Sequence, residues 1–310
     1  MPEIVIAEFM DEAAVAKLRV GHDTHYDPKL VDRPDELAGL AAEARAIIVR
    51  NRTQVRGALL EAARNLECVG RLGVGLDNID TAACKARGIS VFPATGANDL
   101  SVAEYVVTAT LVLLRGAWLS TGSVAAGDWP RERLIGREMA GRTMGLVGLG
   151  SIAREVAWRV HALGMQIVAH DPYIDAADPI WGAVRNLSLD GVFEMADVVS
   201  LHVPLTESTR RLADARRLGL MKPDAILINA ARGGIVEEAA LADALRSGLL
   251  GGAALDVFET EPVTAEAGRR FDGIQNLLLT PHIAGVTTES NVRVSDLIAE
   301  RVAAHLERRR

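Results

Sequence analysis

Short apolar runs alternate with stretches of helical spacing along most of the chain. Before residue 93, the runs that are short enough for buried strands cover residues 3–7, 46–49, 66–72 and 89–92. After residue 142, similar runs cover residues 144–149, 166–169, 196–201, 225–229, 252–255 and 277–279. Helical spacing separates the runs, as at residues 11–18, 79–87 and 237–246. This alternation predicts an α/β protein with parallel sheets, the later one with five or six strands.

Two longer stretches of helical spacing interrupt this rhythm. The first runs from residue 100 to about residue 120, and the second from residue 287 to about residue 308. A helix of about twenty residues spans ~30 Å, so the first could bridge two domains or lie within one core. No strand follows the second, which is therefore free to return to the N-terminal part of the chain.

A glycine turn joins strand to helix in the stretch TMGLVGLGSIAREVAWRVHALGMQIVAHD. Gly148 allows a tight turn, and the missing side chain of Gly150 lets a pyrophosphate approach the backbone. The helix that follows begins at Ser151 and Ile152, where free N–H groups and the helix dipole would face the phosphates. A turn of this kind can also be a plain connection between strand and helix. The strands on both sides favour a dinucleotide site.

An acidic residue ends the second strand of this stretch. Asp171 lies about 20 residues after the second glycine, which is the usual spacing for contact with a ribose. Its carboxylate would accept hydrogen bonds from the ribose hydroxyls and repel a 2′-phosphate. We therefore predict NAD rather than NADP as the cofactor.

The composition is that of an ordinary globular protein and narrows the classes of function. The chain has 310 residues, of which 49% are hydrophobic and 24% charged, and its net charge of −7 argues against a nucleic-acid scaffold. Cys68 and Cys84 lack metal-ligand spacing, so we expect neither a disulfide framework nor a metal site. Neither a signal-peptide pattern nor a membrane-length apolar run is present, so we expect a cytoplasmic protein without a membrane partner.

Three ionisable residues follow the later predicted strands: Arg232, Glu261 and His282. The carboxyl ends of parallel strands line the ligand crevice of such a sheet, so we expect these side chains near the cofactor. Histidine carries protons near neutral pH, a carboxylate orients it, and arginine binds a substrate carboxylate. Each residue alone could be a helix cap or a solvated loop residue. Together they favour a site for a 2-hydroxy or 2-keto acid.

The chain resembles the D-isomer-specific 2-hydroxyacid dehydrogenases over essentially its whole length. The matching stretches are GLVGLGSIA, LINAARGGIVEEAALADAL, GGAALDVFETEPV and TPHIAG. The resemblance implies that His282 is the acid/base, Glu261 its partner and Arg232 the carboxylate clamp. It also implies that the backbone around Val74 and Gly75 holds the substrate carboxylate. The cofactor-binding residues predicted from the glycine turn and the resemblance are Gly148, Gly150, Ser151, Ile152, Asp171, Ala230, Asp256 and Gly285.

The resemblance also implies an architecture of two Rossmann-like, doubly wound domains of the formate/glycerate dehydrogenase type. A discontinuous substrate domain would comprise residues 1–97 and 286–310, and the NAD-binding domain residues 98–285. Hinges near Asn98 and Gly285 would allow closure over the substrate. Members of the family are usually dimers built through the NAD-binding domains, and the region around Trp129 resembles the arm that reaches the partner.

Other stretches of the sequence indicate which substrate the protein acts on. VGRLGVGLDNID and HDPY resemble the 3-phosphoglycerate dehydrogenase branch, whereas LVDRPDEL and IIVRNRTQV are similar to bacterial sulfolactate dehydrogenases. Both substrates carry a second anion besides the carboxylate. Arg50 and Arg52 share one strand face or the following loop and could hold that anion, unless both are solvated surface residues. Arg131 and Arg133 are weaker candidates. We place 3-sulfolactate slightly ahead of 3-phosphoglycerate.

Two alternative functions remain open at this point. A hydroxypyruvate or glyoxylate reductase is the nearer one. The more distant one is a non-catalytic, NAD-sensing transcriptional corepressor, which would need a peptide-binding surface and disordered extensions. A formate dehydrogenase is disfavoured, because that branch has glutamine where Glu261 stands.

Overall fold

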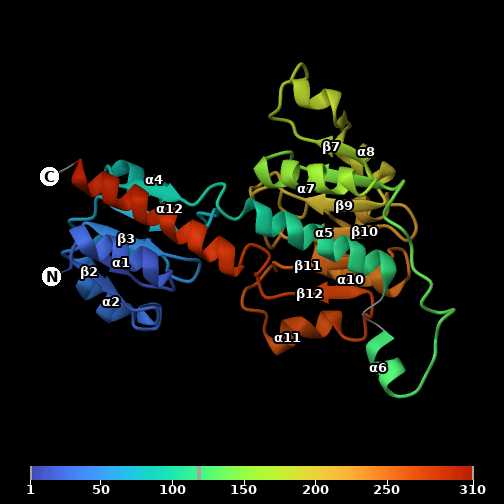
Figure 1. The fold of residues 1–310 in the computed structure, drawn as a ribbon, viewed down its shortest axis with the longest axis horizontal. Helices are drawn as coiled ribbons and strands as arrows, with labels where there is room; N and C mark the ends of the chain where they lie inside the picture. Colours follow the sequence, from blue (N-terminus) through green and yellow to red (C-terminus); the bar gives the residue numbers. More distant parts are fainter. Residues whose placement is uncertain (1, 117–119, 309–310) are drawn as a thin grey trace. The chain divides into compact units, whose positions relative to one another are not determined.

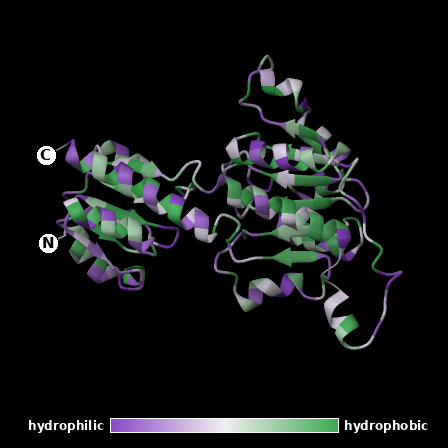
Figure 2. Cartoon of the chain, viewed as in Figure 1, coloured by the Kyte–Doolittle hydropathy of each residue, from purple (hydrophilic) through white to green (hydrophobic). Residues whose placement is uncertain are grey.

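The computed structural model describes residues 2–116 and 120–308, and its contacts divide the chain into two compact units (Figure 1). Unit 1 extends up to Asn98 and resumes at Val286, and unit 2 runs from Asp99 to Gly285. No helix in the described residues is long and apolar enough to cross a membrane. In both units the apolar residues gather on the strands and on the helix faces turned toward them (Figure 2).

Unit 1 is built on a parallel sheet of five strands among its described residues, in the order β2-β1-β3-β4-β5. Its strands are β1 (Ile4–Ile6), β2 (Thr24–Tyr26), β3 (Ala46–Val49), β4 (Cys68–Arg71) and β5 (Ser90–Pro93). Its helices are α1 (Glu12–Gly21), η1 (Leu30–Asp32), α2 (Pro34–Ala41), α3 (Gly57–Ala62), α4 (Thr81–Ala86) and α12 (Thr288–Glu307). Every residue of β1 and β3 is buried, as expected for strands covered on both faces.

The C-terminal helix α12 completes the core of unit 1. Ile298 and Val302 of α12 pack in one cluster with Ile4 and Ile48 of the sheet. A Cβ atom at Gly70 would lie 2.6 Å from Cγ2 of Ile298, so this glycine permits the close approach of helix and strand. The return of the last helix to the N-terminal part of the chain is therefore seen in the structure.

Unit 2 contains a second parallel sheet, with seven strands among the described residues in the order β12-β11-β10-β9-β6-β7-β8. The strands are β6 (Thr143–Val147), β7 (Gln166–His170), β8 (Arg185–Asn186), β9 (Val198–Leu201), β10 (Ile226–Asn229), β11 (Gly252–Leu255) and β12 (Leu277–Leu279). The helices are α5 (Asp99–Arg115), α6 (Ser120–Ala125), α7 (Ser151–Ala162), η3 (Pro179–Gly182), α8 (Leu189–Met195), α9 (Ala215–Leu218), α10 (Glu238–Arg246), α11 (Ala265–Gly268) and η4 (Arg269–Phe271). The predicted α/β fold with doubly wound parallel sheets is confirmed.

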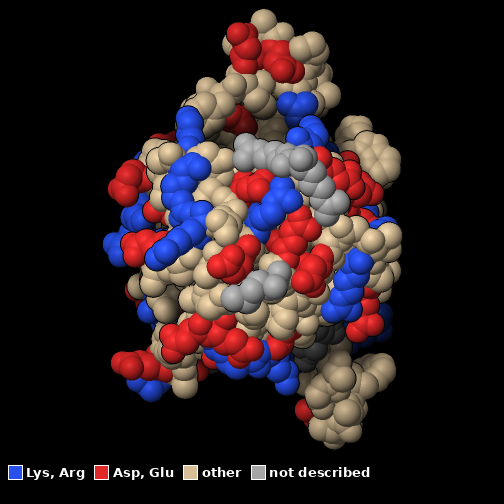
Figure 3. All heavy atoms as spheres, turned by 90° about the vertical axis from the view of Figure 1, so that its left-hand side faces the viewer, with Lys and Arg blue, Asp and Glu red and all other residues tan. Residues whose placement is uncertain are grey.

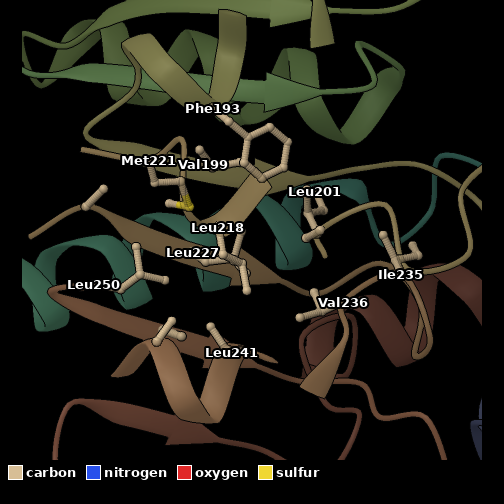
Figure 4. Packing of buried hydrophobic residues seen from close by; sticks show 14 of the residues in the cluster. Phe193, Val199, Leu201, Leu218, Met221, Leu227, Ile235, Val236, Leu241 and Leu250 are labelled. Atoms are coloured by element: carbon tan, nitrogen blue, oxygen red, sulfur yellow. The ribbon is translucent and has the colours of Figure 1, made fainter. Parts of the chain in front are cut away.

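Successive residues of the strands in unit 2 face two different cores. Leu227 points into the cluster that holds Phe193 of α8 and Leu241 of α10 (Figure 4). Its neighbour Ile228 lies in the opposite cluster, together with Val106 of α5. This alternation is the period of two expected for strands in the middle of a three-layer sandwich.

Two predicted features of unit 2 are wrong in detail. The helix expected to reach about residue 120 ends at Arg115, because Gly116 adopts φ +57° and closes the last turn. Residues 117–119 of that prediction lie outside the described residues. The sheet also exceeds the expected five or six strands, since β8 adds an edge strand whose two residues are exposed and show no apolar run.

The surface carries charges of both signs. On the face shown in Figure 3, basic and acidic side chains are interspersed. Pairs of this kind in unit 1 include Lys17 with Asp296 at 2.6 Å and Arg33 with Glu36 at 2.7 Å.

Candidate active site

The glycine turn of unit 2 has the shape that a dinucleotide requires. Gly148 follows β6 with φ +85°, and a Cβ atom there would lie 2.6 Å from the carbonyl oxygen of His202. A Cβ at Gly150 would meet nothing within 4 Å, so the space beside it is open. Helix α7 begins at Ser151 without a side-chain cap. Its first N–H groups can therefore donate to an anion, and the residues present fit a pyrophosphate.

Asp171 is tied to this turn. Its Oδ2 accepts a hydrogen bond from the Leu149 N–H at 2.8 Å, and its Oδ1 accepts one from the Tyr173 N–H at 3.0 Å. Each carboxylate oxygen retains a further lone pair. The carboxylate thus lies beside the turn, fixed in direction and still able to accept from the hydroxyls of a ribose.

Glu261 and His282 form a hydrogen-bonded pair. Nδ1 of His282 lies 2.7 Å from Oε2 of Glu261, and the Phe258 N–H donates to Oε1 at 3.0 Å. Burial opposes ionisation of Glu261, but the hydrogen bonds from His282 and Phe258 outweigh it and lower the pKa of this carboxyl. The ring is thereby oriented through Nδ1, which leaves Nε2 as the nitrogen available to a substrate.

Arg232 lies on the loop after β10 and belongs to the same group. Its positive charge also lowers the pKa of Glu261, so the three predicted catalytic residues are brought together. Asn229 shapes the loop, because its side chain accepts from the Ala231 N–H at 3.1 Å and donates to the Arg232 carbonyl at 2.9 Å. No motif singles out Asn229 in the sequence beyond its place at a strand end.

Close packing of two loops fixes this arrangement. A Cβ atom at Gly233 would lie 1.7 Å from the carbonyl oxygen of Phe258. Only glycine therefore allows the loop that carries Arg232 to lie directly against the segment that positions Glu261.

Asp256 has a different environment from the other predicted cofactor-binding residues. It is 1% exposed, and its carboxylate accepts from the Thr280 hydroxyl at 2.6 Å and from the N–H groups of Ile283 and Ala284, both at 2.8 Å. These bonds hold the loop on which His282 lies, a function that sequence reasoning missed. Two other predicted cofactor residues lie at the ends of elements: Ala230 directly follows β10, and Gly285 is the last residue of unit 2.

His202 is a second histidine at a strand end, but it is not placed for proton exchange. Burial lowers its pKa to about 4, and its Nε2 lies 2.9 Å from the Ser200 hydroxyl. The ring is therefore neutral at pH 7 and part of the framework beside the glycine turn. Among the described residues, no group of three or more His, Cys, Asp or Glu side chains could hold a metal ion.

The predicted substrate residues of unit 1 lie on two loops, the first of which follows β3. The Glu8 side chain is 5% exposed and accepts from the N–H groups of Arg50 at 2.9 Å, Arg52 at 3.3 Å and Thr53 at 3.0 Å. Asn78 donates to the carbonyls of Arg50 at 2.9 Å and Thr53 at 2.7 Å. Glu8 therefore fixes the N–H groups of this loop, and Asn78 fixes its carbonyl groups.

The two arginines of this loop differ in their surroundings. Arg50 donates to the Asn291 side-chain oxygen at 2.8 Å, and its guanidinium lies 5.5 Å from the centre of the Phe9 ring. Burial lowers the pKa of Arg50, opposed by the charge of Glu8. Arg52 forms an ion pair with Asp32 at the surface, where its side chain is 59% exposed. The two arginines are therefore not equivalent in the structure.

The second loop follows β4 and contains Val74 and Gly75. Arg71 donates from Nη1 to the Leu72 carbonyl and from Nε to the Gly75 carbonyl, both at 2.8 Å. Val74 and Gly75 are half-buried. Arg71 thus braces the segment whose backbone is predicted to meet the substrate carboxylate.

Comparison with known proteins supplies the family. The model described as "D-isomer specific 2-hydroxyacid dehydrogenase, NAD binding domain" matches residues 107–284. The chain is similar to the (S)-sulfolactate dehydrogenase of Chromohalobacter salexigens, with 54% identity over 303 residues that cover 97% of both chains. It is also similar to a hydroxypyruvate reductase of Thermotoga maritima, with 40% identity over 88% of both chains.

Two further similarities concern length and structure. The D-3-phosphoglycerate dehydrogenase of Mycobacterium tuberculosis is 40% identical over 97% of this chain, but the match spans only 56% of that protein. Among solved structures, the D-lactate dehydrogenase of Aquifex aeolicus complexed with NAD and lactic acid superposes with a TM-score of 0.84. That comparison has 26% identity and covers 98% of this chain and 95% of the other.

Proposed function

Since this chain belongs to the D-isomer-specific 2-hydroxyacid dehydrogenase family and is an NAD-dependent 2-hydroxyacid dehydrogenase, we propose that its substrate is 3-sulfolactate. The observation that carries this proposal is the environment of Arg50. Its Nη2 donates to the neutral amide of Asn291, and the other N–H groups of the guanidinium can bind an anionic ligand. A substrate with a sulfonate besides its carboxylate supplies that anion.

Bound NAD supplies the acceptor for the hydride that leaves the hydroxyl-bearing carbon. We assign the pyrophosphate to the turn of Gly148 and Gly150 and to the first N–H groups of α7, and the ribose to Asp171. The support is the open space beside Gly150 and the fixed direction of the Asp171 carboxylate.

His282 takes the hydroxyl proton during oxidation and returns it during reduction. Its Nδ1 is engaged by Glu261, so Nε2 exchanges the proton with the substrate. Glu261 keeps the ring in this orientation and balances the charge that the ring gains. Arg232 pairs with the substrate carboxylate, because its planar guanidinium matches the two carboxylate oxygens. The backbone at Val74 and Gly75 is the second partner assigned to that carboxylate.

Within the loop after β3, Arg50 is the residue that we assign to the second anion. Arg52 is already paired with Asp32 at the surface and is the weaker candidate. Asn291 and Phe9 hold the Arg50 guanidinium from two sides, which lowers the entropy that it loses when it binds an anion.

Steady-state kinetics with a panel of substrates test this function. The panel contains both enantiomers of 3-sulfolactate, 3-phosphoglycerate, glycerate and lactate, each with NAD and with NADP. We expect the highest kcat/KM with one enantiomer of sulfolactate and NAD. A preference for glycerate or lactate over both doubly anionic substrates contradicts the assignment of a second anion.

Hydroxypyruvate reduction is the second candidate, favoured by the 40% identity to a hydroxypyruvate reductase. Hydroxypyruvate has no second anion, so this function gives Arg50 nothing to bind. The same panel in the direction of reduction, with NADH and either 3-sulfopyruvate or hydroxypyruvate, separates the two candidates.

We further propose a homodimer formed through unit 2. Trp129 and Ile135 lie on the segment after α6, and both side chains are 79% exposed. A second copy of the chain would cover them. Light scattering coupled to size exclusion should report the mass of two chains for the native protein and of one chain for Trp129→Glu. A native mass of one chain contradicts this assembly.

A further inference from the structure

The loop from Thr280 to Ala284 holds His282 in an unusual backbone conformation. His282 has φ +57°, in the left-handed region that side chains other than glycine rarely adopt. Its N–H donates to the carbonyls of Asp256 at 2.8 Å and of Thr280 at 3.0 Å. Such a conformation persists only where the surrounding contacts enforce it.

The Asp256 carboxylate supplies part of that enforcement. It accepts from the N–H groups of Ile283 and Ala284, which directly follow His282 in the chain. It also accepts from the hydroxyl of Thr280, two residues before His282. The carboxylate therefore clamps the loop on both sides of the histidine.

The hydrogen bonds beyond Asp256 have a definite direction. The Thr280 hydroxyl has a single proton, which it donates to Oδ1 of Asp256, because a carboxylate can only accept. Tyr105 lies 2.7 Å from the same hydroxyl and must therefore be the donor in that contact. Burial raises the pKa of Tyr105, which keeps the phenol protonated as this direction requires.

We propose that Tyr105 and Thr280 are positioning residues for His282, which act through a relay from the Tyr105 hydroxyl to the Thr280 hydroxyl to the Asp256 carboxylate. The relay fixes which way the Thr280 proton points and so fixes the carboxylate that clamps the loop. This inference rests on the proposed role of His282 in proton transfer.

The relay also connects the loop to the helix that supports the cofactor turn. Tyr105 lies on α5, and Ala103 and Val106 of this helix share a core cluster with Ala153 and Val156 of α7. Helix α7 begins at the glycine turn. The same helix thus braces the phosphate-binding end of unit 2 and the loop of its acid/base residue.

A matched pair of substitutions at Thr280 tests the proposal. Thr280→Val keeps the shape but removes the hydroxyl, and we expect kcat to fall by ~10–100-fold, the effect of a misplaced catalytic group. Because the carboxylate-binding residues are untouched, KM should change by less than about threefold. Thr280→Ser restores the hydroxyl and should recover most of kcat. Tyr105→Phe removes only the outer donor and should lower kcat by about fivefold, the effect of one neutral hydrogen bond.

Thr110→Val is the control on α5, the helix that carries Tyr105. The Thr110 hydroxyl is buried and donates to the Val106 carbonyl at 2.8 Å, away from the loop. This variant should lose stability but keep kcat. Melting temperatures of all the variants separate loss of folded protein from loss of kcat, and Tyr105→Phe keeps the test available if Thr280→Val does not fold.

The outcomes distinguish this inference from the proposed function. His282→Ala is measured beside the other variants, and unchanged activity there removes the proposed role of His282 and the relay with it. Loss of activity in His282→Ala, with kcat of folded Thr280→Val or Tyr105→Phe equal to that of the native enzyme, overturns the relay alone. A Thr280→Ser variant as slow as Thr280→Val also overturns it, because the hydroxyl is then not the group that matters.

Discussion

Two loops at the carboxyl ends of parallel strands, one in each unit, are held by the same device. In unit 1, the Glu8 carboxylate gathers the N–H groups of the loop after β3, which carries Arg50. In unit 2, the Asp256 carboxylate gathers those of the loop after β12, which carries His282. Each carboxylate follows the strand adjacent to that of the loop it holds. A buried anion thus replaces the partners that backbone N–H groups lose where a sheet ends.

The two loops differ in what they hold fixed. The loop of unit 2 forces His282 into a left-handed conformation and ties its ring to Glu261, so both backbone and side chain are fixed. The loop of unit 1 is fixed in its backbone, and the long side chain of Arg50 is held by single contacts with Asn291 and Phe9, without a left-handed backbone conformation. Proton transfer requires a precise distance, whereas recognition of an anion tolerates adjustment. The loop that presents the proton carrier is thus the more constrained of the two.

Removal of the side chain that the rigid loop presents should have the largest effect. His282→Ala should lower kcat by ~10²–10⁴-fold, as is typical when an acid/base group is lost. His161→Ala is the control, because His161 is an exposed histidine on α7. Steady-state rates with sulfolactate and NAD check this, and equal rates for both variants would refute the role of His282.

Removal of the side chain that the adaptable loop presents should affect binding of one class of substrate. Arg50→Gln should raise KM for sulfolactate by ~10–100-fold, the effect of losing a hydrogen bond to a charged group, and leave KM for lactate unchanged. Arg52→Gln is the matched control two residues away, and it should change neither KM value by more than about twofold. Equal effects of the two variants would show that the contrast between these arginines has no functional meaning.

Substitution of the buried carboxylates tests whether the two loops share one device. Glu8→Gln and Asp256→Asn each replace an accepting oxygen with an NH₂ group, and each should lower the free energy of unfolding by ~1–3 kcal/mol. Urea denaturation measures this, with Asp32→Asn as an exposed control. We also expect the kinetic effects to diverge, with kcat reduced in Asp256→Asn and KM for sulfolactate raised in Glu8→Gln. If either Glu8→Gln or Asp256→Asn keeps native stability, that carboxylate does not stabilise its loop, and the two loops are not held in the same way.

The smallest expected effect concerns pH. Hydrogen bonds lower the folded-state pKa of Glu261 below its ordinary value of 4.5, so their contribution to stability is complete above pH 4.5 and is lost as pH falls through the folded-state pKa. Native protein should exceed Glu261→Gln in stability by ~1 kcal/mol or less, because both partners are partly exposed. Urea denaturation from pH 8 to pH 3 should show a constant difference above pH 4.5 that shrinks below it. A difference that grows on acidification contradicts the direction of this shift.

Much of the fold could be predicted because its strands are buried on both faces. Runs such as residues 225–228, which read AILI, are apolar without interruption, and a sheet covered by helices is the arrangement that buries them. The edge strands β2 and β8 lacked this property, since neither is an apolar run, and both were missed. The end of α5 was missed because the conformation of Gly116, rather than apolar periodicity, determines it.

The site was predictable to a different degree. Strand ends and motif resemblance pointed to Arg232, Glu261 and His282, and the structure brings these residues together. The supporting residues Thr280 and Tyr105 are 175 positions apart in the chain, so no local pattern could reveal their contact. The difference between Arg50 and Arg52 was likewise hidden, because it depends on Asn291 and Asp32 from distant segments.

The packing of α12 against the sheet of unit 1 has a consequence for folding during protein synthesis. Ile298 and Val302 fill the core around Ile4 and Ile48, so that core stays open until the ribosome has made residues near the end of unit 1. Protein synthesis adds ~5–20 residues per second, so β1 remains without its packing partner α12 for ~15 seconds or longer after it has been made. Unit 2 is continuous in the chain and can fold during that interval. Helix α12, which is made after unit 2, therefore closes a sheet whose strands are made before unit 2, and nascent chains that stall before α12 expose an apolar face that chaperones would recognise.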